Sequence, residues 1–159
     1  MANLTVGIGE YKISNNESDI IKTYALGSCV ALMIYDKINK VAGMIHIALP
    51  ESSVNLDKAR ALPGYFADTG IPILIEEMKK FGSVKKNIWI KIAGGAKVMD
   101  PNSVFDIGKR NILAIKKILW NRNLGPIAED VGGDFSRTVS LLVDTGEVIL
   151  SSGNRSWNI

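Results

Sequence analysis

Two neighbouring apolar runs dominate the hydrophobic pattern of the chain, and a short polar linker joins them. The runs are Cys29–Tyr35 and Val41–Ile47, and the linker is Asp36–Lys40. Each run is only seven residues long, and a turn-like segment separates the two. This arrangement predicts two antiparallel strands of one β-hairpin.

The pairing within this hairpin decides which side chains meet. A loop of Asp36–Asn39 would place Cys29 directly opposite His46, with their Cβ atoms about 5 Å apart. Any loop with an even number of residues keeps the two side chains on one face, whereas an odd loop separates them. The chain has one cysteine and one histidine, so local geometry brings its only thiol towards its only imidazole.

The rest of the pattern alternates between strand-like and helix-like segments, which predicts an α/β or α+β domain with mostly antiparallel strands. The expected strands are Leu4–Ile13, Ile20–Leu26, Asn87–Ala93, Pro126–Val131, Ser136–Val143 and Glu147–Ser151, and the expected helices are Tyr65–Lys80 and Ile107–Trp120. Pro72 either kinks the first of these helices or lies in the first turn of a regular part that starts near Asp68 or Thr69. We expect a polar loop at Ser52–Leu62 on the rim of a site, another loop through Pro101–Ser103, and a frayed tail at 154–159.

Composition narrows the class of protein. The 159 residues predict a single domain, 1–159, and the apolar fraction of 47% is ordinary for a globular chain. The net charge of +3 is spread out, and no basic run is interleaved with aromatic residues, so we do not expect nucleic-acid binding. A single cysteine excludes an internal disulfide framework. No signal peptide or membrane span is recognisable, so we expect a cytoplasmic protein without membrane insertion.

The candidate chemistry gathers around Cys29. The turn Gly27–Ser28 precedes it and offers backbone N–H groups for an oxyanion, His46 offers a base, and Thr23 offers a hydroxyl to orient the imidazole. The structural alternatives remain open: Cys29 as a small core residue, His46 as a core histidine bonded to a carbonyl, and Thr23 as an ordinary strand residue. One cysteine and one histidine do not make a usual zinc site, and we expect neither a metal nor a cofactor.

Other motifs are weaker. The glycine pairs at 94–95 and 132–133 lack the context of phosphate-binding loops, so we interpret them as turns or as close approaches of two backbones. The carboxylates of Glu129 and Asp130 are interpreted as surface or turn groups rather than as an acid–base pair.

Longer strings of residues resemble the chemoreceptor glutamine deamidases of the CheD family. The most specific strings are Leu26–Val30, with its Gly-Ser-Cys, and Val41–Pro50, with its His-x-x-Leu-Pro; similar strings lie at 7–11, 65–69, 91–96, 107–111 and 128–133. The resemblance covers nearly the whole chain up to about Gly153. It implies an α+β fold in which packed mixed or antiparallel β-sheets are flanked by helices, as in deamidating bacterial toxins.

The same resemblance implies a catalytic triad and a substrate. It puts the nucleophile on Cys29, the base on His46 and the orienting hydroxyl on Thr23, with the oxyanion bound by backbone N–H groups near Gly27 and Ser28. The implied reaction is hydrolysis of glutamine side chains in methyl-accepting chemoreceptors to glutamate and ammonia. Two alternatives are a regulatory role as partner of a CheC-type response-regulator phosphatase and methylesterase activity on receptor glutamates.

Overall fold

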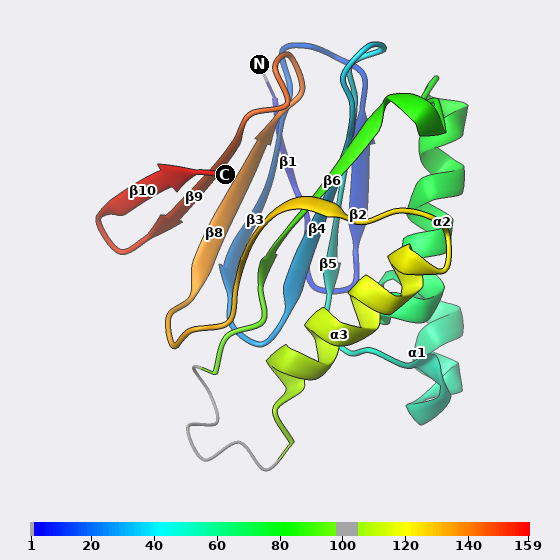
Figure 1. Cartoon of the computed structure of the whole chain (residues 1–159), viewed down its shortest axis with the longest axis vertical. Helices are drawn as coiled ribbons and strands as arrows, with labels where there is room; N and C mark the ends of the chain where they lie inside the picture. Colours follow the sequence, from blue (N-terminus) through cyan, green and yellow to red (C-terminus); the bar gives the residue numbers. More distant parts are fainter. Residues whose placement is uncertain (1, 98–104) are drawn as a thin grey trace.

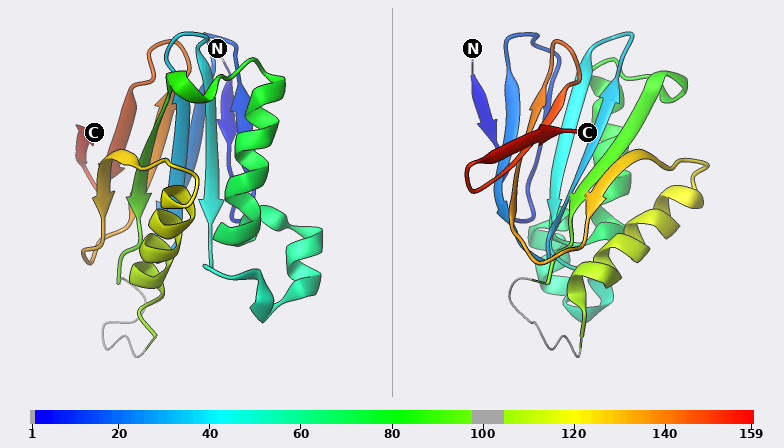
Figure 2. Two further views of the ribbon diagram at one scale, coloured as in Figure 1. Left: turned by 45° about the vertical axis from the view of Figure 1, so that its right-hand side comes forward. Right: turned by 60° about the vertical axis from the view of Figure 1, so that its left-hand side comes forward.

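Two five-stranded β-sheets pack face to face, and the helices cover only one of them (Figure 1). The computed structural model of the chain describes residues 2–97 and 105–159. In the right-hand view of Figure 2 the second sheet lies between the first sheet and the helices. The strands are β1 (Asn3–Thr5), β2 (Tyr11–Ser14), β3 (Ile20–Leu26), β4 (Val30–Asp36), β5 (Val41–Ile47), β6 (Ile88–Gly94), β7 (Pro126–Val131), β8 (Arg137–Leu142), β9 (Val148–Ser152) and β10 (Arg155–Asn158), and the helices are α1 (Leu56–Ala61), α2 (Ala67–Lys80) and α3 (Ile107–Trp120).

The strand order confirms the predicted α+β class. The first sheet has the order β1-β3-β8-β9-β10, and the second sheet has the order β2-β5-β4-β6-β7. Only the pairs β1–β3 and β6–β7 are parallel. The other six pairs are antiparallel, so both sheets are mixed but mostly antiparallel. Within the described residues, no helix is both long and apolar enough to span a membrane.

The central strands of the second sheet are buried on both faces. Every residue of β4 and β5 is buried, which explains why their sequences are continuous apolar runs rather than alternating ones. Val30, Leu32 and Ile34 pack towards the helices. Ala31 and Met33 pack towards the first sheet. The apolar core therefore has two layers, one on each side of the second sheet.

The register of the β4–β5 hairpin differs from the predicted one. Asp36 pairs with Val41, so the loop is Lys37–Lys40, and Ala31 rather than Cys29 lies opposite His46. Asp36 is the last residue of β4 rather than the first residue of the loop. In this place its carboxylate accepts hydrogen bonds from the N–H groups of Ile38 and Asn39 in the loop, and these bonds favour the shifted register. The loop still has an even number of residues, so the predicted shared face of Cys29 and His46 is retained.

Three other expectations are wrong, and a fourth is not tested. The segment Ser52–Leu62 contains helix α1 and is not an irregular loop. The strand expected at Leu4–Ile13 is divided into β1 and β2 by a loop. The tail expected to fray forms β10, because it pairs with β9 in a terminal hairpin. The loop expected through 101–103 lies outside the described residues.

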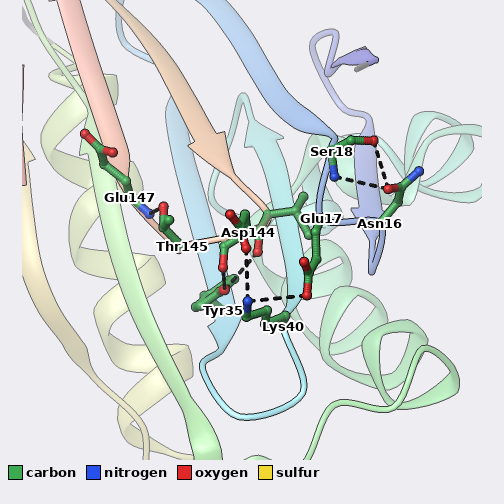
Figure 3. Close-up of polar contacts among 9 residues, drawn as sticks. Asn16, Glu17, Ser18, Tyr35, Lys40, Asp144, Thr145 and Glu147 are labelled. Carbon is green, nitrogen blue, oxygen red and sulfur yellow. Dashed lines mark hydrogen bonds and ion pairs between the residues drawn. The ribbon is translucent and has the colours of Figure 1, made fainter.

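The end of the sandwich that holds the Lys37–Lys40 loop, which we call the hairpin end, is held by polar contacts between the two sheets (Figure 3). The Tyr35 hydroxyl, at the end of β4, donates to the carbonyl of Val143, just after β8, at 2.8 Å. The Lys40 ammonium lies 2.9 Å from the Asp144 carboxylate and 3.3 Å from the Glu17 carboxylate. The catalytic candidates lie at the opposite end of β4 and β5, which we call the site end.

Candidate active site

A chain of hydrogen bonds joins Thr23, on the first sheet, to His46, on the second. Thr23 is fully buried, and His46 is only 4% exposed. The Thr23 hydroxyl oxygen lies 2.7 Å from His46 Nδ1 and 2.7 Å from the carbonyl oxygen of Val6. The two side chains converge because the inner faces of β3 and β5 meet at the interface between the sheets.

The geometry selects one histidine tautomer. The Val6 carbonyl can only accept, so the single Thr23 hydroxyl proton is donated to it. The Thr23 oxygen must then accept from His46 Nδ1–H, which leaves Nε2 without a proton in the neutral imidazole. Within the described residues, Nε2 is buried and has no hydrogen-bond partner. His46 Nε2 is thus a buried nitrogen that carries no proton and has no partner among the described residues.

The backbone of His46 is fixed by the loop that precedes β2. Its carbonyl accepts from the N–H group of Gly9 at 2.8 Å, and its N–H donates to the carbonyl of Glu10 at 3.1 Å. Gly9 has φ +81, and a side chain there would also collide with Leu62, so only glycine suits this position. The loop therefore positions both the main chain of His46 and, through Val6, its side chain.

Cys29 lies at the end of the turn between β3 and β4, one residue before β4 begins. Its side chain packs against the apolar cluster between the two sheets, on the same side of the second sheet as Ala31 and Met44. Residues of β5 alternate in direction, so His46 faces the same side as Met44. Because Ala31 is the direct partner of His46 and Cys29 lies two residues before Ala31, Cys29 is a diagonal neighbour of His46 on the same face.

Burial shifts the pKa values of His46 and Cys29 in directions that disfavour a thiolate–imidazolium ion pair. Desolvation lowers the pKa of His46 to about 4, although the nearby Val6 carbonyl acts in the opposite direction. Desolvation raises the pKa of the Cys29 thiol. At neutral pH both groups are therefore uncharged in the resting protein, and the imidazole is in its proton-accepting form.

The turn before Cys29 is anchored to the end of β6. The carbonyls of Gly27 and Cys29 accept from the N–H groups of Ala96 and Gly95 at 2.8 and 2.9 Å. A Cβ atom on Gly94 would lie 2.3 Å from the Cys29 carbonyl oxygen, so the first glycine pair permits the close backbone approach that its sequence suggested. Gly27 and Ser28, the expected oxyanion turn, are thereby fixed together with Cys29 against the end of β6.

Cys29 opens onto an outer pocket of about 500 Å³. The pocket is lined by Ala25, Gly27, Ser28, Cys29, Asp134, Phe135 and Ser136. Phe135 forms an aromatic wall, and the Arg137 guanidinium lies 4.2 Å above its ring centroid. A separate apolar groove of about 260 Å³ lies near Leu49 and Ile107, and it contains neither Cys29 nor His46. The outer pocket is therefore the entrance to the thiol.

A partly buried polar cluster supports this wall. Arg137 donates to the Asp130 carboxylate at 2.8 Å and to the Gly132 carbonyl at 2.9 Å. Trp157, on β10, donates to the same carboxylate at 2.8 Å, and its ring packs against Phe135. Asp130 is thus part of the support for the pocket and not an isolated surface group, and β10 is part of the same unit.

The sequence pattern had not indicated Val6, Phe135 or Asn111 as parts of the site. Asn111, on α3, is fully buried and donates to the carbonyls of Ser28 and Ala48. The signal for Asn111 was present as a polar residue on the otherwise apolar inward face of an amphipathic helix. Within residues 2–97 and 105–159, no group of three or more His, Cys, Asp or Glu side chains is arranged to hold a metal ion.

Comparisons with known proteins agree on one family. Residues 48–152 match the family model described as CheD chemotactic sensory transduction. The chain is 53% identical to a probable chemoreceptor glutamine deamidase CheD of Syntrophotalea carbinolica over 100% of both chains. It is 45% identical to CheD 1 of Syntrophus aciditrophicus over 96% of this chain and 95% of that protein. It is 40% identical to the chemoreceptor glutamine deamidase CheD of Thermotoga maritima over 91% and 88%.

Proposed function

Since this chain belongs to the CheD family, we propose that it is a cysteine-dependent deamidase of chemoreceptor glutamines. Residues 1–159 act as one deamidase domain, and they act in the cytoplasm, on the cytoplasmic helices of the receptors. The relatives carry the name of this activity. The proposal for this chain adds the residues and the order of proton transfers.

The observation that carries the proposal is the free Nε2 atom of His46. Thr23 and the Val6 carbonyl hold Nδ1 in its protonated form, and Nε2 is buried without a partner among the described residues. A histidine retained only for packing would be expected to have this atom satisfied, because an unpartnered buried acceptor costs about 1–3 kcal/mol. An atom held ready to accept the Cys29 proton explains that cost.

The electrostatics favour general-base catalysis over a preformed ion pair. The pKa of His46 is lowered to about 4 and that of Cys29 is raised, both by burial. A stable thiolate–imidazolium pair is therefore disfavoured before substrate binds. The proton moves from Sγ to Nε2 as sulfur attacks, when negative charge passes from sulfur to the substrate oxygen.

The reaction then has two stages, the formation of a thioester and its hydrolysis. Cys29 Sγ bonds to the carboxamide carbon of the glutamine side chain, and the carbonyl electrons become an oxyanion held by N–H groups of the Gly27–Cys29 turn. The His46 imidazolium gives its proton to the amide nitrogen, and ammonia leaves with the C–N bonding pair. Water, deprotonated by His46, attacks the thioester carbon. The C–S bond then breaks, the sulfur leaves with the bonding pair and takes the proton back from the His46 imidazolium, and the products are glutamate and the restored thiol.

The pocket suits a side chain that belongs to a folded protein. It is open, and its lining at Ala25, Ser136 and Phe135 is accessible from outside the sandwich. Phe135 provides an apolar surface for the two methylene groups of glutamine, while the carboxamide reaches Cys29. A glutamine projecting from a receptor helix can therefore enter without the helix itself being buried.

The test is mass mapping of a receptor cytoplasmic fragment after incubation with the protein. Cys29→Ala should lower the deamidation rate by at least about 10³-fold, with an unchanged melting temperature. Lys80→Ala is the matched control, because the exposed Lys80 side chain forms an ion pair with Glu77 on α2 and does not line the outer pocket, and this variant should retain full activity. Activity that survives in the Cys29→Ala protein would contradict the proposal.

The same spectra separate the alternatives. Deamidation makes a glutamine peptide slightly heavier, whereas methylesterase activity removes the mass of a methylene group from a methylated glutamate peptide. A protein that serves only as partner of a CheC-type phosphatase would leave both peptides unchanged and would co-purify with that phosphatase equally well as wild type or Cys29→Ala.

A further inference from the structure

The carbonyls of three consecutive residues in the nucleophile turn are all hydrogen-bonded, but only two of them are bonded to backbone. Gly27 and Cys29 are held by the N–H groups that follow β6. The carbonyl between them, that of Ser28, accepts from Asn111 Nδ2 at 3.0 Å. Asn111 is thus the side chain that completes the anchoring of the turn.

The same amide also reaches the strand that carries the base. Asn111 Nδ2 donates to the carbonyl of Ala48 at 3.0 Å. Ala48 lies two residues after His46 in the chain. One buried amide group therefore ties the turn that carries Cys29 to the end of the strand that carries His46.

The orientation of one peptide group follows from the first bond. The Ser28 carbonyl and the Cys29 N–H belong to the same trans peptide and point in opposite directions. Because the carbonyl points at Asn111 on α3, the N–H points away from α3. Within the described part of the chain, that N–H has no hydrogen-bond acceptor, and both residues line the outer pocket.

We propose that Asn111 is a positioning residue that orients the Ser28–Cys29 peptide so that its N–H binds the oxyanion formed during amide hydrolysis. This inference rests on the deamidase function proposed above. Asn111 does not touch the substrate; it acts through the Ser28 carbonyl.

The energetic cost of Asn111 supports this role. Its Oδ1 is buried and has no partner among the described residues, and an unpartnered buried acceptor destabilises the fold. The helix also approaches so closely that a Cβ on Gly108 would lie 2.4 Å from the Gly95 carbonyl oxygen. A leucine at 111 would fill similar space without an unsatisfied oxygen, so packing alone does not explain the asparagine.

The experiment compares two reactions of the same thiol. Deamidation passes through an oxyanion, whereas alkylation of Cys29 by iodoacetamide does not. Asn111→Leu should lower kcat for deamidation of a receptor fragment by about 30- to 100-fold. Its KM and its alkylation rate at the same pH should stay within about threefold of wild type, because substrate contacts and the His46 base are intact.

Leu119→Ala is the control for stability. Leu119 is a fully buried residue of the same helix, with no part in the turn, and it should lower the melting temperature while kcat is retained. If Asn111→Leu does not fold, Asn111→Ser, which is smaller and retains one hydroxyl donor, should show a partial loss of kcat with the same unchanged alkylation rate.

Two outcomes would overturn the inference. In one, an Asn111 variant that folds keeps kcat within threefold of wild type. In the other, deamidation and alkylation fall together, which would mean that Asn111 only holds the thiol in place. A wild-type protein that does not deamidate contradicts the proposed function itself, whereas an active wild type with an equally active Asn111→Leu contradicts this inference alone.

Discussion

The two ends of the sandwich bury polar groups in opposite ways. At the hairpin end, the fully buried Asp36 carboxylate accepts from the N–H groups of Ile38, Asn39 and Val84 at 2.8–2.9 Å, and from the Asn39 side chain at 3.1 Å. At the site end, His46 Nε2 and Asn111 Oδ1 are buried and lack partners within the described residues.

The pKa values show what this difference does. Burial alone would raise the pKa of Asp36, but its hydrogen bonds outweigh burial and hold the pKa below its usual value. Burial lowers the pKa of His46 to about 4, and its hydrogen bonding does not outweigh that. Both side chains are almost inaccessible to solvent, and the number of hydrogen-bond partners helps to decide whether a buried group stabilises the fold or is left available for a reaction.

Among the variants that compare the two ends, the largest effect is expected from removing the Thr23 hydroxyl at the site end. Thr23→Val keeps the shape but leaves His46 Nδ1–H without the Thr23 acceptor, so the preferred tautomer and the ring orientation are no longer fixed. We expect kcat/KM for deamidation to fall by about 10²-fold, equivalent to about 2.7 kcal/mol of transition-state stabilisation. Deamidation kinetics on a receptor fragment measure it.

Thr138→Val is the matched control for this variant. Thr138 is on the adjacent strand β8, and its hydroxyl accepts only a long bond of 3.3 Å from the Ala25 N–H. It should keep activity within about threefold of wild type. If Thr23→Val were as active as this control, the orienting role of Thr23 would be wrong.

The next effect is a pH dependence of stability that belongs to His46. The unfolded chain protonates this histidine near pH 6.5, whereas the folded chain does so only near 4, so the unfolded state binds more protons between these values. The contribution of His46 to the free energy of unfolding is therefore fully present above about pH 6.5 and is lost as the pH is lowered towards 4. Between pH 7.5 and 5 the free energy of unfolding should fall by about 2 kcal/mol.

Urea unfolding of wild type and His46→Gln at both pH values isolates this contribution. The acidic side chains titrate in both proteins, so the difference between the two pH dependences belongs to the histidine. Equal pH dependences would mean that His46 is not desolvated as its burial implies, and the case for a neutral resting base would fail.

These residues also show how far the sequence alone could lead. Parity along two strands was enough to place Cys29 and His46 on one face, because any even loop gives that result. The register was not predictable, since it depends on whether Asp36 joins the strand or the loop. That choice is made in part by a bond to Val84, which is distant in the sequence.

Contacts between distant segments account for what the sequence did not predict. Asn111 reaches Ser28 across 83 positions and Ala48 across 63, so helical periodicity marked it only as a polar residue on an apolar face. The tail through Trp157 looked polar and unanchored, but it is anchored by Asp130 on another sheet. Strand parity brought Cys29 and His46 together, whereas Thr23, as the third member of the set, came from family resemblance rather than from spacing.

The smallest effect is expected from removing a hydroxyl at the hairpin end. Tyr35→Phe keeps the ring that packs against Trp89 but loses the bond to the Val143 carbonyl. We expect the free energy of unfolding to fall by about 1 kcal/mol and kcat/KM to stay within about twofold of wild type, because β4 separates this end from Cys29. Urea unfolding and deamidation kinetics on the same preparation measure both. A loss of activity like that of Thr23→Val, in protein that remains folded, would mean that the two ends are coupled, and the contrast between a stabilising end and a reactive end would not hold.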